Sequence, residues 1–391
     1  MAGRRFLFYS HDSFGLGHLR RTISLARAVA AREPDADILI VTGLALSTSY
    51  RLPPHVETLK LPAVRKDEHG EYHALRLQLP FEEICTLRSD ILESTAKAFS
   101  PDVLVVDKTP VGLRGELRST LEWIAPRPDV RAVLGLRDID DSPNRVRTDW
   151  AGGRVRKAIV RYYDSVLVYG PPSSPDALSC MGWDDLGVPV ERVGYVGPTQ
   201  ASGPAPGLPP RYILVTAGGG GDGFRILAAF ADAIRLRALE MPAVIVAGPL
   251  MSPDEVTQLS EMTEGLNVRI AEFRADMESV VAGAAAVVAM AGYNTVFEIL
   301  SARKPALFVP RVHPREEQLV RAELLAQAGL ADVLHPDDLT PASMRTALDR
   351  LLERPPLAEG LVDLDGAARA AKLLCLEADA AAEAEPMPAR G

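Results

Sequence analysis

The residues best suited to chemistry lie between residues 290 and 318. A short apolar run, predicted to be a buried strand, leads into a small-residue turn at Gly292 that opens a helix at Asn294 or Thr295. The free backbone N–H groups and the positive end of a helix start favour a phosphate. Glu298, one turn further, could accept hydrogen bonds from both hydroxyls of a ribose. The stretch therefore predicts a site for a ligand that carries phosphate and sugar.

A second phosphate-site candidate is a run of four glycines, which also stands between a predicted strand and a predicted helix. Glycine has no Cβ, so backbone N–H groups in such a run can approach a pyrophosphate closely. No Lys-Ser/Thr pair follows the run, which argues against a Walker loop and ATP hydrolysis. The alternative interpretation is a flexible turn without a ligand. The run consists of Gly218, Gly219, Gly220 and Gly221.

A histidine near the N-terminus is a candidate general base. Gly15, Gly17 and His18 follow an apolar run at residues 5–9 and stand at the predicted start of a helix. Arg20 occupies the third glycine position of a dinucleotide fingerprint, which disfavours a redox enzyme. A histidine with an ordinary pKa of about 6.5 can accept a proton from a hydroxyl near neutral pH. The alternative is a helix-start residue without a chemical role.

Further polar residues follow predicted strands of the same domain. Asp107 could hold the His18 imidazole and stabilise its charged form, or it could cap the next element instead. Arg137 and Asp138 follow the next strand and could contact a phosphate or hydroxyl of an acceptor. Asp138 and Asp140 also resemble a metal-binding acidic pair, but such patterns arise often by chance, so the sequence assigns no metal.

Parallel sheets would bring these residues together. Apolar runs typical of buried strands alternate with helical periodicity, which predicts βαβ units whose ligands bind at the carboxyl ends of the strands. The predicted strands are 5–9, 38–42, 103–106, 132–136, 165–169, 192–196, 212–216, 243–247, 268–271, 286–290 and 306–309. The predicted helices begin at residue 19 and continue with 81–99, 253–264, 277–282, 295–302, 316–328 and 366–382.

The chain, with 391 residues, is long enough for two domains of about 150 to 200 residues each. A Pro/Gly-rich stretch without apolar periodicity separates two α/β series and reads as a linker. We therefore predict two doubly wound, Rossmann-like α/β domains in tandem. Their bounds are 1–198 for the N-terminal domain, 199–210 for the linker, 211–362 for the C-terminal domain, 363–382 for a helix and 383–391 for a flexible tail.

Composition limits the classes of function. Hydrophobic residues make up 47% of the chain and charged residues 24%, as in globular proteins. The formal net charge of -9 argues against a nucleic-acid partner, because that binding requires a dense Lys/Arg surface. The three cysteines lie far apart and form no metal or disulfide pattern. No apolar run reaches the roughly 20 residues that span a bilayer, so the sequence predicts a cytoplasmic protein.

Several motifs keep an order that resembles the nucleotide-sugar domain of GT-B glycosyltransferases. The likeness is strongest to family 28, typified by the lipid-linked N-acetylglucosaminyl transferase of peptidoglycan synthesis. In the N-terminal half, residues 14–20 resemble the glycine loop of the family in a shorter form. The C-terminal motifs lie between residues 211 and 331 and comprise 217–221, 272–277, 291–298 and 305–310, followed by His313, Glu317 and Gln318.

The resemblance implies a GT-B fold with an interdomain cleft and a set of site residues. His18 matches the glycine-loop histidine, for which an acceptor-side or base role is implied. In the C-terminal domain, the residues that match donor-binding positions are Phe273 at the uracil, Gly292 to Thr295 at the diphosphate, Glu298 at the ribose, and Gln318 with the adjacent Glu317 at the sugar hydroxyls.

We therefore predict a metal-independent glycosyltransferase that moves a sugar from a nucleoside diphosphate, with UDP favoured, to an acceptor hydroxyl. No cofactor is expected beyond the donor substrate. The acceptor is left open between a lipid-linked, a polysaccharide and a small-molecule hydroxyl, with peripheral membrane contact compatible with the first. Two alternatives keep the donor residues: a nucleotide-sugar hydrolase or 2-epimerase, and a non-catalytic protein that binds nucleotide sugars.

Overall fold

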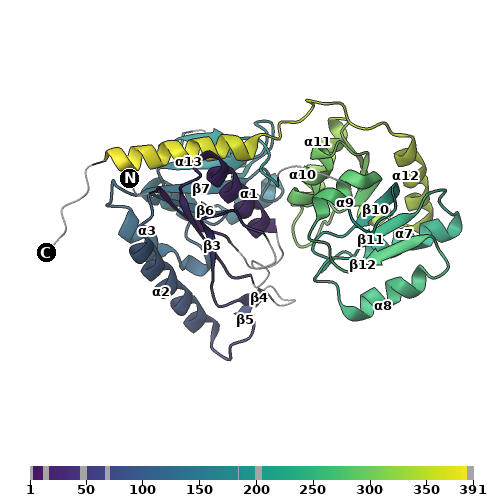
Figure 1. Cartoon of the computed structure of the whole chain (residues 1–391), viewed down its shortest axis with the longest axis horizontal. Helices are drawn as coiled ribbons and strands as arrows, with labels where there is room; N and C mark the ends of the chain where they lie inside the picture. The colour runs from purple at the N-terminus through teal and green to yellow at the C-terminus, as the bar shows by residue number, and fades with distance from the viewer. Residues whose placement is uncertain are drawn as a thin grey trace. The chain divides into compact units, whose positions relative to one another are not determined.

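A computed structural model describes residues 3–11, 17–44, 51–66, 71–183, 185–198 and 205–384. The chain forms two compact units (Figure 1). Unit 1 contains Met1–Gly197 together with Asp363–Gly391, and unit 2 contains Pro198–Val362. The end of the chain therefore returns to the first unit. Gly15 and residues 199–204 of the predicted linker lie outside the described residues.

Unit 1 is built on a seven-stranded parallel sheet with the strand order β3-β2-β1-β6-β7-β8-β9. A separate antiparallel hairpin pairs β4 (Val64–Lys66) with β5 (Tyr72–Ala74). The strands of the large sheet are β1 (Arg5–Tyr9), β2 (Asp37–Thr42), β3 (Val56–Lys60), β6 (Val103–Asp107), β7 (Arg131–Arg137), β8 (Ser165–Tyr169) and β9 (Val190–Arg192).

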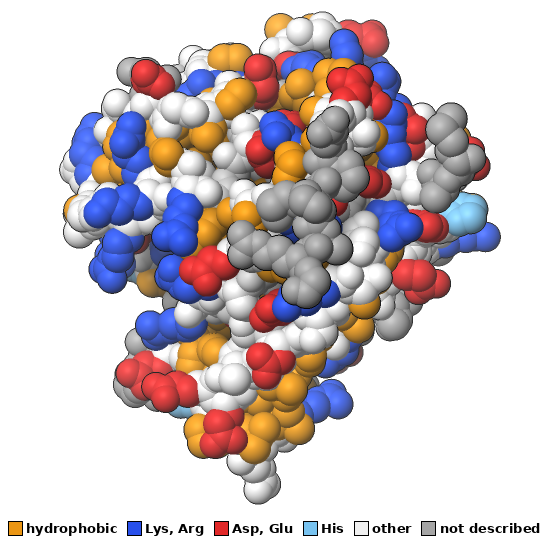
Figure 2. Space-filling view, turned by 90° about the vertical axis from the view of Figure 1, so that its left-hand side faces the viewer, with side chains coloured by type: hydrophobic (Ala, Val, Ile, Leu, Met, Phe, Trp, Pro, Cys, Tyr) orange, Lys and Arg blue, Asp and Glu red, His pale blue; other side chains and the backbone are white. Residues whose placement is uncertain are grey.

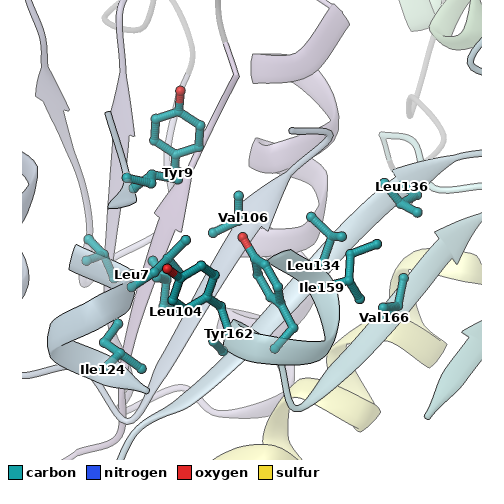
Figure 3. Packing of buried hydrophobic residues seen from close by; sticks show 14 of the residues in the cluster. Leu7, Tyr9, Leu104, Val106, Ile124, Leu134, Leu136, Ile159, Tyr162 and Val166 are labelled. Carbon is teal, nitrogen blue, oxygen red and sulfur yellow. The ribbon is translucent and has the colours of Figure 1, made fainter. Parts of the chain in front are cut away.

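One face of this sheet carries the larger part of the core. Side chains two positions apart on a strand point to the same face, so Leu7 and Tyr9 of β1 lie on the same side. Figure 3 shows them in one cluster with side chains of β6, β7 and β8 and of two covering helices. The Tyr9 hydroxyl points away from the aliphatic side chains there. The covering helices on this face include α2 (Phe81–Phe99), α3 (Arg118–Ile124) and α5 (Arg154–Tyr162).

The C-terminal helix α13 (Gly366–Glu383) packs along α1 (Gly17–Arg32) and also contacts β6 and β7 (Figure 1). Ion pairs join α13 to the rest of unit 1. Arg4, just before β1, pairs with Asp379, and Arg131 Nε of β7 lies 3.0 Å from Glu377 Oε2. The Ser165 hydroxyl donates to Glu377 at 2.6 Å. The last helix is therefore an integral layer of unit 1. Two short helices, α4 (Pro143–Asp149) and α6 (Ala177–Cys180), complete the unit.

Unit 2 has a six-stranded parallel sheet with the order β12-β11-β10-β13-β14-β15. Its strands are β10 (Tyr212–Thr216), β11 (Ala243–Val246), β12 (Val268–Ala271), β13 (Ala284–Ala289), β14 (Ala306–Phe308) and β15 (Asp332–Val333). Its helices are α7 (Phe224–Leu236), α8 (Pro253–Met262), α9 (Met277–Gly283), α10 (Tyr293–Ser301), α11 (Glu317–Gln327) and α12 (Pro341–Glu353).

Each sheet has one position where the chain reverses its direction of growth. In unit 1 the chain moves from β1 to β2 on one side and returns to β6 on the other, so the switch lies between β1 and β6. In unit 2 the corresponding switch lies between β10 and β13. Ligands of doubly wound sheets bind outside the carboxyl ends of the strands at such positions. The residues that follow these four strands are therefore the first candidates for a site.

One predicted strand is wrong. The sequence predicted a strand at residues 192–196, whereas β9 ends at Arg192 and the next four residues are buried without strand pairing. The reason is Gly194, whose φ of 86° is incompatible with an extended strand. At this position a Cβ would lie 2.9 Å from the Asp363 carboxylate, because the returning chain packs against the backbone here. The apolar residues that suggested a strand instead pack against the start of α13 and the residues before it.

The surface of unit 1 mixes both signs of charge. Figure 2 shows Lys and Arg side chains gathered along the left-hand edge of one face, with Asp, Glu and hydrophobic side chains between and beside them. Among the helices of the described residues, none is long and apolar enough to cross a membrane.

Candidate active site

His18 lies in the first turn of α1, and Asp107 ends β6, directly at the switch point of unit 1. The His18 Nδ1 atom is 2.5 Å from Asp107 Oδ2, and the His18 side chain keeps 13% of its surface exposed. A carboxylate at Nδ1 fixes the ring so that Nε2 is the free nitrogen. Asp107 therefore orients the imidazole, in preference to the capping role that the sequence left open.

Arg21 is a third member of this cluster that sequence reasoning missed. Its Nε donates to Asp107 Oδ1 at 3.1 Å, a second nitrogen also bonds Oδ1, and the guanidinium lies 5.5 Å from the centre of the Tyr169 ring. The Arg21 Nη2 atom is also 3.0 Å from His18 Nδ1. Because Arg21 Nη2 and His18 Nδ1 both bond the Asp107 carboxylate, we assign the Nδ1 proton to the bond with Asp107. The spacing of three residues between His18 and Arg21 on one helix was the available signal.

Burial keeps the imidazole neutral. It lowers the pKa of His18 to about 4, because desolvation of the charged ring outweighs the opposing attraction of Asp107. Burial alone would raise the pKa of Asp107, but the charges of Arg21 and His18 hold it well below its usual range. At neutral pH the pair is thus an ionised carboxylate and a neutral imidazole. A neutral imidazole with an unprotonated Nε2 is the state in which histidine accepts a proton.

A second histidine, His11, packs against the first. Its ring meets the His18 ring edge-on with 5.7 Å between the centroids, and only 7% of the residue is exposed. Burial is the main reason that its pKa falls to about 3, and the neighbouring His18 and Lys108 act in the same direction. Nothing in the sequence pointed to His11, because the residue belongs to no recognisable spacing with His18.

The other predicted acceptor residues that the structure describes lie at the carboxyl end of β7 or at the start of α1. Arg137 and Lys108 both approach Asp140 Oδ1, at 3.7 and 3.6 Å, and Lys108 has a left-handed φ of 69°. Asp138 is completely buried, whereas Gly17 is exposed. Among the described residues, no group of three or more His, Cys, Asp and Glu side chains could hold a metal ion. Contact of these residues with an acceptor stays a prediction.

In unit 2, the glycine turn and the start of α10 flank the switch point. Gly218 and Gly220 have φ values of 63° and 91°, which L side chains rarely adopt. A Cβ on Gly220 would lie 2.6 Å from the Ala247 carbonyl oxygen, so packing explains this glycine. A Cβ on Gly218 would lie 3.8 Å from Thr295 Oγ1. The exposed Gly218 therefore lies beside the start of α10.

The helix α10 begins after Gly292 without a side-chain cap hydrogen bond, and its positive end lies at the carboxyl end of β13. Asn294 is 9% exposed and Glu298 is 4% exposed. Glu298 lines a pocket of about 210 Å³ between α9 and α10, together with Glu278, Phe297, Ser301 and Arg303. The acid predicted to bind ribose therefore opens into a cavity, in spite of its low exposure.

The remaining predicted donor residues lie in loops after β12 and β14. Phe273 follows β12 and is 39% exposed, which is unusual for a large aromatic side chain. His313 stands in the loop before α11, whose first two residues, Glu317 and Gln318, are only 5% and 8% exposed. Because β10, β13 and β14 are neighbours in the sheet, their loops meet at one edge. The loop that holds Phe273 lies two strands away from β10.

The geometry defines a class of protein. One doubly wound unit has a histidine–aspartate pair, and the other has a glycine turn beside a helix start. Two such units have the architecture of GT-B glycosyltransferases. Solved structures share the fold over nearly the whole chain. The calicheamicin glycosyltransferase CalG4 matches with a TM-score of 0.63 and 20% identity, over 99% of this chain and 100% of its own. MurG of Acinetobacter baumannii matches with a TM-score of 0.55 and 14% identity, over 98% of this chain and 100% of its own.

The sequence comparison narrows the class to one family. Residues 212–362 match the glycosyltransferase family 28 C-terminal domain. This domain of unit 2 is of the family 28 type, and the whole chain has the GT-B fold. A curated relative is the UDP-N-acetylglucosamine--N-acetylmuramyl-(pentapeptide) pyrophosphoryl-undecaprenol N-acetylglucosamine transferase of Lactiplantibacillus plantarum, which is 24% identical over 86% of this chain and 88% of its own length.

Other relatives of the same name match shorter segments. The enzyme of Glaesserella parasuis is 37% identical over 29% of this chain, and that of Geobacillus kaustophilus is 44% identical over 17%. These segments span only 31% and 19% of the two relatives.

The lowered pKa values of His11 and His18 predict how the free energy of unfolding depends on pH. Both histidines have folded-state pKa values of about 3 and 4, below the ordinary value of about 6.5, so the unfolded chain binds more protons between pH 4 and 6.5. The free energy of unfolding should therefore fall as the pH drops from 7 to 5, by at most about 1.4 kcal/mol per pH unit for each histidine. Asp107 contributes nothing in this window, because its stabilising ionisation is lost only below pH 4.

Denaturant unfolding at pH 7 and pH 5 measures this loss. A His11→Phe variant keeps a ring in the same place but cannot titrate, so it should lose less stability than the wild type over the same interval. Equal losses in the two proteins would contradict the assignment of this effect to His11.

Proposed function

We propose that the protein transfers a sugar from UDP to an acceptor hydroxyl, with the donor bound by unit 2 and the acceptor by unit 1. The observation that carries the proposal is the exposed Gly218 beside the start of α10, within residues that match the family 28 domain. A glycine turn beside the positive end of a helix suits a diphosphate, because the missing Cβ atoms let the phosphates approach the backbone. The preference for UDP rests on the likeness of Phe273 and Glu298 to family positions and on the names of the curated relatives.

In the proposed reaction, His18 Nε2 accepts the proton of the acceptor hydroxyl, and the oxygen forms a bond to the anomeric carbon. The bond between that carbon and the phosphate oxygen breaks, and UDP leaves with its electron pair. Asp107 stabilises the imidazolium that forms, since its carboxylate is already bonded to Nδ1. The N–H groups of the glycine turn and of α10 stabilise the departing diphosphate, a role that helix ends can fill without a metal.

A thermal-shift panel tests the donor assignment. A ligand that binds only the folded state adds roughly 2.7 kcal/mol of stability at a concentration of 100 times its Kd, so UDP-glucose and UDP-N-acetylglucosamine should raise Tm. GDP-mannose and dTDP-glucose are the controls, because they carry a base other than uracil and should raise Tm less. A Glu298→Ala variant should lose most of the shift, because Glu298 opens into the pocket of unit 2. No shift with any nucleotide sugar would refute the proposed function.

A turnover assay separates transfer from hydrolysis and epimerisation. The protein with UDP-sugar alone should release little UDP or altered sugar, and release should rise when an acceptor is added. The acceptors should include an undecaprenyl-diphosphate-linked sugar, since the curated relatives carry such an acceptor in their names. Rapid release of UDP without an acceptor would favour the hydrolase or epimerase.

A further inference from the structure

The first turns of α11 bury polar side chains instead of apolar ones. Glu317, Gln318 and Arg321 are 5%, 8% and 1% exposed. Buried polar groups are retained where they are hydrogen-bonded or where a ligand uses them. Arg321 donates to the carbonyl oxygen of Ala291 at 2.9 Å and so supports the turn before α10. The inward side of α11 is therefore tied to the β13 loop of the proposed donor site.

Arg311 connects the two residues at the start of α11 to each other and to the glycine turn. Its backbone N–H donates to Gln318 Oε1 at 3.2 Å. Its guanidinium forms an ion pair with Glu317 through one nitrogen and lies 3.2 Å from Asp222 through another. Asp222 stands directly after Gly221 in the glycine turn. One arginine therefore joins the loops that follow β10 and β14.

These bonds decide which groups of Glu317 and Gln318 can face a ligand. A backbone N–H can only donate, so the Gln318 atom that meets Arg311 is the amide oxygen, and the NH₂ group is left as a donor. One carboxylate oxygen of Glu317 is bonded to the guanidinium, and the other has no hydrogen-bond partner within the described residues. Together the two residues keep one N–H donor group and one carboxylate acceptor, which match the oxygen and the proton of sugar hydroxyls.

We propose that Arg311 is a positioning residue for the transferred sugar. Its guanidinium sets the carboxylate of Glu317 for hydroxyl recognition, beside the amide of Gln318 that its backbone N–H holds. This inference rests on the proposed function. Arginine is suited to the task because its planar fork holds several acceptors at fixed angles, whereas a lysine ammonium provides only a point charge. The side chain of Arg311 is 26% exposed, so replacing Arg311 does not remove a core residue.

The test compares binding of UDP-glucose and of UDP alone by titration calorimetry. In Arg311→Lys, the affinity for UDP-glucose should fall about tenfold while the affinity for UDP stays within about twofold, since the guanidinium positions Glu317 for the sugar and not for the nucleotide. An Arg237→Lys variant is the control, because Arg237 forms an exposed ion pair with Asp349 in the same unit. It should bind both ligands as the wild type does.

The outcomes separate this inference from the function on which it rests. If the wild type binds neither UDP nor UDP-glucose, the proposed function itself fails. If the wild type binds both and Arg311→Lys weakens both equally, Arg311 only supports the loop, and the inference is overturned. Unchanged affinity of the variant for UDP-glucose overturns it as well.

Discussion

Replacing His18 by alanine is expected to lower kcat of sugar transfer by roughly 10²- to 10⁴-fold, the usual contribution of a positioned general base. Asp107 and Arg21 remain paired in the variant, so the fold of unit 1 should persist. Donor binding should be unchanged, because the donor residues belong to unit 2. Initial rates with saturating UDP-sugar and acceptor, together with a titration of UDP, measure the two quantities.

A matched variant shows whether the effect belongs to this histidine. His73 is exposed on β5, so His73→Ala should keep the wild-type rate. The base assignment fails if His18→Ala retains full activity with the true acceptor. A loss of UDP affinity equal to the loss of rate would instead indicate damage to the whole protein.

Replacing Glu116 by glutamine is expected to destabilise unit 1 by about 3 to 5 kcal/mol, since it leaves a buried arginine without its counter-charge. Arg88 is fully buried and binds Glu116 through two nitrogens, at 2.6 and 2.8 Å. The Tyr9 hydroxyl donates to the same carboxylate at 2.7 Å. The network joins β1, α2 and the short helix at Leu113–Gly115, so one substitution weakens three elements.

Tryptophan fluorescence during denaturant unfolding reports this change selectively. All three tryptophans of the chain, Trp123, Trp150 and Trp183, belong to unit 1. A double variant, Arg88→Met with Glu116→Leu, removes both charges and should be less destabilised than Glu116→Gln, because no unpaired charge stays buried. If Glu116→Gln costs less than about 1 kcal/mol, the ion pair is not the main support of this region.

Local patterns predicted most of the elements and the candidate donor motifs. Four predicted elements match the structure residue for residue: the helix at 81–99 and the strands at 165–169, 212–216 and 268–271. The reason is that strands of parallel sheets and amphipathic helices have characteristic periods of apolar residues. The donor motifs could also be found in this way, since a phosphate site needs glycines and a helix start that are adjacent in the chain.

Contacts between distant residues could be proposed from the sequence but not decided by it. His18 and Asp107 are 89 positions apart, and the order of the strands in the sheet decides that they meet. The position of α13 on α1, and with it the fate of the strand predicted at 192–196, depends on where the end of the chain returns.

The sequence by itself determined the class of the protein: alternating strands and helices, a glycine turn, and a carboxylate one turn into a helix that starts after Gly292. Only the tertiary structure decided which side chains hold the reactive ones in place. Arg21 and Tyr169 surround Asp107, and Arg311 reaches Asp222, Glu317 and Gln318. The reason is physical: a local pattern fixes the type of an element, but the partner of a buried charge is fixed by packing.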